Sequence, residues 1–213
     1  MMLSNVLPNS EHLKLLFILF LISASIGCST TQPRVPVENR ESTWASRQGE
    51  LSAIKYWRLS GRLSVSQGDE AWNLSLEWQQ KDEDYQISIY GPFGAGKVRL
   101  TGNAHGVMLK NADDESYYAD HPEELLYQQT GVLMPIEGLR YWVMGLASPQ
   151  QIIKPKIDPL GRLAFLEESN WKVDFKRYMQ VSGMDLPRKV FIVKSAEEID
   201  VRLVVDKWTL GAF

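Results

Sequence analysis

From Tyr56 onward, apolar and polar residues alternate in short runs, which predicts half-buried β-strands rather than helices. The first two runs flank the polar segment 67–70 and predict a hairpin with one tryptophan-rich apolar face. This face consists of Trp57, Leu59, Leu63, Val65, Trp72, Leu74, Leu76 and Trp78. Further strands are predicted at 107–109, 117–118, 163–166, 171–175, 190–193 and 199–205.

A second hairpin is predicted over residues 87–100, where alternating runs lie on both sides of the turn Gly91-Pro-Phe-Gly94. Pro92 presets the bend, and the glycines permit backbone angles that other residues avoid. Phe93 is unusual, because the tip of a hairpin is normally polar. Two interpretations are open: Phe93 folds back onto the sheet as an apolar plug, or it is an exposed probe for lipid or a partner.

The same turn spells G-x-x-x-x-G-K from Gly91 to Lys97, which is most of a phosphate-binding loop. Val98 stands where that loop needs a Ser or Thr hydroxyl for magnesium. The sequence also continues as a strand where the motif requires a helix. Nucleotide binding is therefore not expected.

Three helices are predicted around the strands. Residues 41–55 form an amphipathic pattern that is interrupted near Gly49. A short helix opens after Asp120, which is placed as an N-cap with an acidic residue three positions on. Another begins at Pro135, and Gly145 helps to end it. The fold class is mostly β, or α+β, with antiparallel strands before and after a short helical insert.

Residues 1–27 have the pattern of a lipoprotein signal peptide. Lys14 precedes an apolar run that is shorter than the ~20 residues of a membrane-spanning helix. The run ends in Ser25-Ile-Gly-Cys28, which resembles a bacterial lipobox, although Ser25 stands where that pattern usually has Leu. Cys28 is the single cysteine of the sequence and is therefore the expected lipidation site.

The segment 28–40 is predicted to be a lipid anchor and flexible tether, because Pro33 and Pro36 lie among small and polar residues. Residues 41–213 are the predicted folded domain. Ser29 replaces the Asp that marks inner-membrane retention in lipoproteins of the type that the lipobox resembles. The expected location is therefore the periplasmic face of the outer membrane, with a lipid anchor.

Composition and motifs exclude several classes of function. The 213-residue chain has a net charge of −3 and no basic block, so nucleic-acid binding is not expected. The sequence contains His105 and His121 but no G-x-S-x-G hydrolase motif, no H-E-x-x-H zinc-protease motif and no second cysteine. The acidic residues 113–115 lack the spacing of a calcium loop and predict a solvated turn. We therefore expect no enzyme activity, no cofactor and no metal.

Four segments, in this order and spacing, resemble the outer-membrane lipoprotein receptors of the LolB family: Trp78-Gln-Gln80, the stretch from Asp84 to Gly94, the stretch from Pro135 to Leu146, and Asn170-Trp-Lys-Val173. The resemblance implies an incompletely closed antiparallel β-barrel with a helical lid over an apolar acyl cavity. It also implies that Gly91, Pro92, Phe93 and Gly94 form a membrane-insertion loop. Phe93 stands where the family often has a protruding leucine.

This resemblance implies a receptor that accepts acylated lipoproteins from the periplasmic carrier LolA and inserts them into the outer membrane. The implied partners are LolA, the lipoprotein cargo and outer-membrane lipids, and the chain is expected to be a monomer. Candidates for the acyl cavity are Trp57, Trp72, Trp78, Ile87, Ile89, Trp142, Val143 and Leu146. Core packing is the alternative for each of them.

Two other classes of protein remain open. A soluble LolA-like carrier would share the sheet but would lack both the lipobox at Cys28 and the apolar tip at Phe93. A structural or assembly-factor lipoprotein of the outer membrane would act as a protein-interaction module and would need no acyl cavity.

Overall fold

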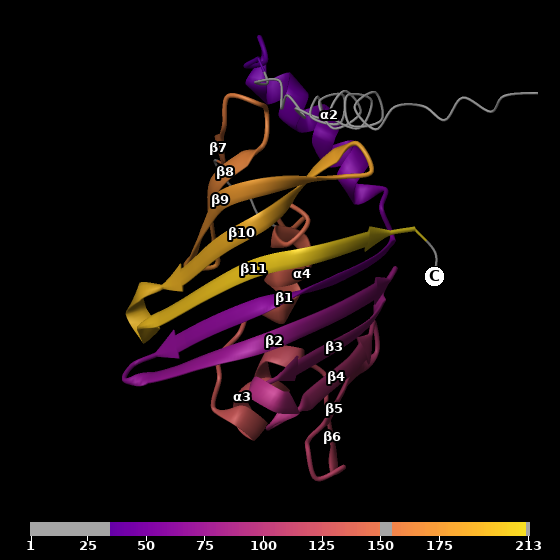
Figure 1. The fold of residues 1–213 in the computed structure, drawn as a ribbon, viewed down its shortest axis with the longest axis vertical. Coiled ribbons are helices and arrows are strands. Elements are labelled where there is room, and N and C mark those ends of the chain that lie inside the picture. The colour runs from indigo at the N-terminus through magenta and orange to yellow at the C-terminus, as the bar shows by residue number, and fades with distance from the viewer. Residues whose placement is uncertain (1–34, 150–154, 212–213) are drawn as a thin grey trace, which may run out of the picture. The chain divides into compact units, whose positions relative to one another are not determined.

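The computed structural model describes residues 35–149 and 155–211, apart from the side chain of Phe93. The chain divides into two compact units, and the second, residues 36–213, contains all the secondary structure described below (Figure 1). The predicted signal peptide, Cys28 and the first residues of the tether lie outside the described residues. Within the described part of the chain, every helix is too short or too polar to cross a membrane.

The described strands form one antiparallel sheet of 11 strands in the order β6-β5-β4-β3-β2-β1-β11-β10-β9-β8-β7 (Figure 1). The strands β1 to β6 follow one another on one side of the sheet and β7 to β11 on the other, and the two halves meet at the centre, where β1 pairs with β11. The strands are β1 (Tyr56–Gln67), β2 (Glu70–Lys81), β3 (Asp84–Tyr90), β4 (Val98–Asn103), β5 (Gly106–Lys110), β6 (Ser116–Ala119), β7 (Lys156–Ile157), β8 (Leu163–Glu168), β9 (Trp171–Val181), β10 (Met184–Lys194) and β11 (Ile199–Leu210).

The sheet does not close, since β6 and β7 each pair on one side only among the described residues. This confirms the mostly antiparallel, incompletely closed barrel that the sequence implied. The pairing of β1 with β11 is irregular between Ser60 and Gly61. Only glycine fits at position 61, because a Cβ there would lie 2.4 Å from the carbonyl oxygen of Val204.

The predicted alternation of the first hairpin is confirmed. Trp57 and Trp78 are both 2% exposed, and their ring centroids lie 5.4 Å apart on the inner face. Trp208 of β11 adds a third ring at 5.5 Å from Trp57. Charged residues take the outer face, where Arg62 pairs with Asp206. The inner face therefore supplies an aromatic core across β1, β2 and β11.

Helices α3 (Pro122–Thr130) and α4 (Ile136–Trp142) form the insert between β6 and β7, and α4 lies behind β11, β1 and β2 in Figure 1. The N-cap of α3 is His121, without a side-chain hydrogen bond, so the expectation for Asp120 is wrong. Helix α4 ends at Trp142, so Val143 and Leu146 follow the helix instead of belonging to it. Both are nevertheless buried.

Helix α2 (Arg40–Ser52) is the predicted amphipathic helix, but it runs through Gly49 without interruption. The side chain of Asn39 caps it by accepting a 3.0 Å hydrogen bond from the Ser42 N–H. The Val37 N–H donates to the Pro159 carbonyl at 2.9 Å. The last residues of the predicted tether are therefore bound to the folded unit.

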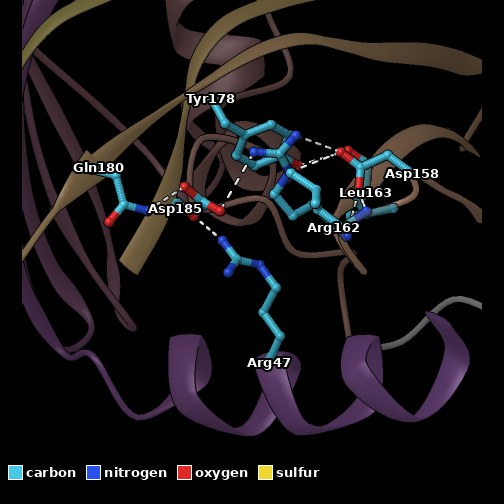
Figure 2. Close-up of polar contacts among 8 residues, drawn as sticks. Arg47, Asp158, Arg162, Leu163, Tyr178, Gln180 and Asp185 are labelled. Atoms are coloured by element: carbon cyan, nitrogen blue, oxygen red, sulfur yellow. Dashed lines mark hydrogen bonds and ion pairs between the residues drawn. The ribbon is translucent and has the colours of Figure 1, made fainter. Parts of the chain in front are cut away.

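A polar cluster attaches α2 to the barrel (Figure 2). Arg47 donates to the backbone carbonyl of Asp185 at the start of β10. Arg162 forms an ion pair with Asp158 at 2.7 Å, and its guanidinium lies 4.4 Å from the centre of the Tyr178 ring. The Tyr178 hydroxyl donates to the Leu163 carbonyl at 2.7 Å. Burial lowers the pKa of Arg47 and raises the pKa of Tyr178 well above its usual range.

Candidate lipid-binding site

The inner face of the sheet and α4 enclose an apolar void of about 10 Å³. Four of the predicted cavity residues line it, namely Trp78, Ile87, Ile89 and Val143. The remaining wall consists of Leu63, Leu76, Met134, Ile136, Leu139 and Leu203. A void of this size holds about one water molecule, so these side chains pack as a core in this conformation.

The other predicted cavity residues lie outside the wall of this void. Trp57 packs on Trp78 and Trp208, and Trp72 is only partly buried at the edge of the core. Leu146 is buried beyond the end of α4, and Trp142 is 1% exposed. Trp142 lines a different feature, a pocket at the mouth of the barrel. The structure therefore divides the predicted set between a packed interior and this mouth.

The mouth pocket has a volume of about 600 Å³ and lies where α4 meets the ends of several strands. Its wall includes Gly138 and Trp142 from α4, Asn103 from β4, and Glu168 and Trp171 from the β8–β9 turn region. Trp78 and Ile136 line both the mouth pocket and the apolar void. These two residues therefore border both the mouth and the interior.

The C-terminal half of α4 is attached to the β2–β3 turn through Arg140. Its guanidinium donates to the Glu83 carboxylate at 2.8 and 3.0 Å and to the Asp82 carbonyl at 2.7 Å. The hydrogen bond to Arg140 lowers the pKa of Glu83, and the bond to Glu83 raises the pKa of Arg140. These contacts hold the lid helix against the turn.

The loop before α4 is attached to the tip of the β1–β2 hairpin. The Gln67 side chain donates to the Gly131 carbonyl and accepts from the Leu133 N–H, each at 3.1 Å. The first turn of α4 is held by Glu123 of α3, which accepts a 2.7 Å hydrogen bond from the Glu137 N–H. Burial raises the pKa of Glu123. Polar contacts therefore hold the loop before α4, the first turn of α4 and its C-terminal half.

Sequence reasoning missed the contacts of these polar residues with the α4 region. It used Gln67 only as part of a turn and Glu123 only as an acidic residue near a helix start, and Glu83 occurs in a turn without a distinctive pattern. For Arg140 the sequence does contain an indication, because this residue falls inside the family-like segment from Pro135 to Leu146. In the isolated sequence, Arg140 looks like an ordinary charged position on an amphipathic helix.

The predicted membrane-insertion loop forms a turn between β3 and β4. Pro92 to Gly94 make a single 3-10 turn, η1 (Pro92–Gly94), and the Gly91 N–H donates to the Ala95 carbonyl at 2.8 Å. Gly94 and Gly96 have φ angles of 83° and 59°, which suit glycine. Pro92, Gly94 and Ala95 are exposed. The side chain of Phe93 lies outside the described part, so the choice between plug and probe stays a prediction.

The phosphate-loop pattern lacks the required structural context, because Val98 begins strand β4 where that motif needs a helix. A hollow of about 810 Å³ lies near the sheet edge and includes Gln79, Gln86 and Thr101. These residues alternate with buried neighbours, so their side chains face outward and away from the apolar interior. The described residues contain no group of His, Cys, Asp or Glu side chains that fits a metal ion.

The family model described as outer membrane lipoprotein LolB matches residues 55–208, which extend from the residue before β1 almost to the end of β11. An outer-membrane lipoprotein LolB from Nitrosococcus oceani is 35% identical over 199 residues, which are 93% of this chain and 98% of the relative. The chain belongs to the LolB family. A second LolB, from Alkalilimnicola ehrlichii, is 35% identical and covers 92% of this chain and 97% of its own.

Solved structures agree on the fold of this LolB-family chain. A LolA superfamily protein from Nitrosomonas europaea superposes with a TM-score of 0.53 at 7% identity, over 81% of this chain and 94% of that one. At this identity the likeness concerns the fold alone. The segment from Pro135 to Leu146, one of the four that carried the resemblance, contains α4. Ile136 and Trp142, at opposite ends of that helix, both line the mouth pocket.

Proposed function

We propose that this LolB-family chain is an outer-membrane lipoprotein receptor that accepts acylated lipoproteins from the carrier LolA and inserts them into the outer membrane. The observation that carries the proposal is that Trp78 and Ile136 border both an open mouth pocket and an apolar interior roofed by α4. Acyl chains that enter at the mouth pass these two side chains and leave water.

Acyl binding in this proposal requires α4 to move away from the sheet, because a void of about 10 Å³ holds no alkyl chain. Each methylene removed from water contributes about 0.8 kcal/mol. The acyl chains replace the apolar contacts that α4 loses when it moves. The free-energy cost of losing those contacts is therefore offset by burial of the acyl chains. What opposes opening is then the set of polar attachments at Gln67 and Arg140.

Transfer in this proposal follows a gradient of affinity, since a ligand moves only toward the state that binds it better. The receptor binds acyl chains more tightly than LolA does and less tightly than the bilayer. Cys28 anchors the receptor at the periplasmic face of the outer membrane, and the loop of Gly91, Pro92, Phe93 and Gly94 engages the lipid. The proposed receptor acts as a monomer.

The test is a two-step transfer assay with a labelled triacylated lipoprotein. The cargo is first bound to LolA, then mixed with this protein in its export-processed form, and finally presented with liposomes. We expect the label to move from LolA to this protein and then into the liposomes. Cargo that stays on LolA in the presence of folded receptor contradicts the proposal and favours a structural or assembly role.

A further inference from the structure

Trp142 is a residue of the mouth pocket with an unusual buried polar atom. Its side chain is 1% exposed, and its indole Nε1 is the buried side-chain nitrogen or oxygen that lacks a hydrogen-bond partner among the described residues. Two other buried tryptophans are paired: Trp78 donates to the Gln80 side chain at 3.0 Å, and Trp208 donates to the Pro187 carbonyl at 3.3 Å. Native proteins seldom leave such a donor unused.

The position of the Trp142 ring is fixed by its neighbours. The ring lies across Gly138, where a Cβ would come within 2.7 Å of Cζ2. Its centroid is 6.5 Å from that of Trp171, and all three residues line the mouth pocket. A ring held in this way has little freedom to turn its N–H toward another part of the protein.

The charges around the mouth determine which acceptor suits this N–H. Glu83, Asp120, Glu123, Glu137 and Glu168 line the pocket, whereas Arg140 is its only arginine or lysine among the described residues. Glu168 is 4% exposed and already accepts a 3.1 Å hydrogen bond from the Ser148 N–H. This acidic lining repels an anionic group such as a phosphate. A neutral oxygen acceptor is favoured instead.

Because Trp142 lies at the mouth and the interior is apolar, the acceptor belongs to the part of a lipid where its chains join the head. We propose that the Trp142 indole N–H binds a carbonyl oxygen of the ester or amide linkages that attach acyl chains to the cargo. The mouth pocket thereby recognises neutral acyl carbonyls and not anionic phospholipid heads. This inference rests on the proposed function, because it places the chains in the interior beneath α4.

The test compares an ester with an ether. Dioleoylglycerol has ester carbonyl oxygens, whereas the ether-linked dioleyl glycerol lacks them. The affinity of each lipid is measured by its displacement of a fluorescent fatty acid from the full-length protein. One hydrogen bond of about 1 kcal/mol corresponds to a roughly fivefold difference in affinity. We expect the wild type to bind the ester about fivefold more tightly, and Trp142→Phe to bind both lipids with the affinity that the wild type shows for the ether.

Trp208→Phe is the matched control, because it removes another buried indole N–H, one that donates to the Pro187 carbonyl and does not line the mouth pocket. This variant should keep the preference for the ester. A wild type without that preference, or a Trp142→Phe variant that retains it, overturns the inference while leaving acyl binding intact. If neither lipid binds to the folded wild type, the proposed function fails first and the inference fails with it.

A second measurement avoids the need for a folded Trp142→Phe variant. Nuclear magnetic resonance of the wild type with nitrogen-labelled tryptophan reports each indole N–H directly. We expect the ester, but not the ether, to shift one indole proton downfield, as a new hydrogen bond to a carbonyl requires. Equal spectra with the two lipids overturn the proposal.

Dioleoyl phosphatidylglycerol, which carries a phosphate, should bind more weakly than dioleoylglycerol, and tighter binding also contradicts the inference.

Discussion

Arg140 of α4 and Glu83 of the β2–β3 turn are joined by hydrogen bonds of 2.8 and 3.0 Å, although they lie 57 positions apart in the sequence. The same guanidinium reaches the Asp82 carbonyl at 2.7 Å. Arg140 thus connects the proposed lid to the turn between β2 and β3. It is the most direct place at which to loosen α4 without altering its apolar face.

Arg140→Met should release α4 while preserving much of the length of the side chain. We expect the backbone amides of α4 to exchange with solvent faster and a fluorescent fatty acid to be taken up faster, because the polar attachment that opposes opening is lost. Arg62→Met is the control, since Arg62 forms an exposed pair with Asp206 on the outer face. Equal exchange in α4 of both variants contradicts the role assigned to Arg140.

Gly138→Ala should destabilise the protein by about 1 to 3 kcal/mol, because the new Cβ would overlap the buried Trp142 ring. Gly49→Ala is a matched control in a helix. No atom lies within 4 Å of the Cβ built at Gly49, and alanine favours a helix by up to about 1 kcal/mol over glycine. Thermal unfolding should therefore shift in opposite directions. A neutral Gly138→Ala would show that the ring moves freely.

Glu123→Gln should change the pH dependence of stability. Burial raises the pKa of Glu123, so the folded state favours the protonated form more than the unfolded state does. The stability that the protonated carboxyl contributes is fully present below the pKa of Glu123 in the unfolded state. It is lost as the pH rises through the pKa of Glu123 in the folded state. Gln keeps an oxygen that can accept from the Glu137 N–H.

We therefore expect Glu123→Gln to unfold at a higher temperature than the wild type at pH 7, with the gap closing as the pH falls toward 4.5, the ordinary pKa of a glutamate carboxyl. Glu83→Gln should behave in the opposite way, because the hydrogen bond to Arg140 lowers the pKa of Glu83. Its loss of stability should be present at pH 7 and vanish as the pH falls through the lowered pKa. Parallel pH profiles for the two variants would contradict both assignments.

Phe93→Glu tests the membrane-insertion loop. Moving one phenyl ring from water into the membrane interface contributes up to roughly 1.5 to 3 kcal/mol, which is a tenfold or larger change in membrane engagement. If Phe93 is a probe, the variant should fold and load cargo normally but fail to release it into liposomes. Phe93→Leu should retain release, since it keeps an apolar tip. A plug predicts instead a lower melting temperature and a joint loss of loading and release.

Cys28→Ala tests the lipid anchor. If Cys28 is the acylated residue, cells fed with a labelled fatty acid should incorporate no label into the variant, and its precursor should stay uncleaved. The wild type expressed in parallel provides the comparison. Label that persists in Cys28→Ala assigns the anchor to another position.

Local pattern was enough to predict most of the sheet. The alternation that places Trp57 and Trp78 on one face follows from the period of two in a strand, whatever the rest of the chain does. The turns at Gly68 and Gly94 rely on glycine angles that are also local. The order of the short segments around Trp78, Ile87 and Trp142 was sufficient to indicate the LolB family, which the comparisons confirm.

Tertiary structure decided how these residues are used. Ile87 and Trp142 are both buried apolar positions in the sequence pattern, yet one lines the interior void and the other lines the mouth. The attachment of Arg140 to Glu83 and that of Arg47 to Asp185 join segments that are 57 and 138 positions apart. The physical reason is that periodicity reports only which way a side chain faces, whereas its neighbours depend on where distant segments of the chain meet.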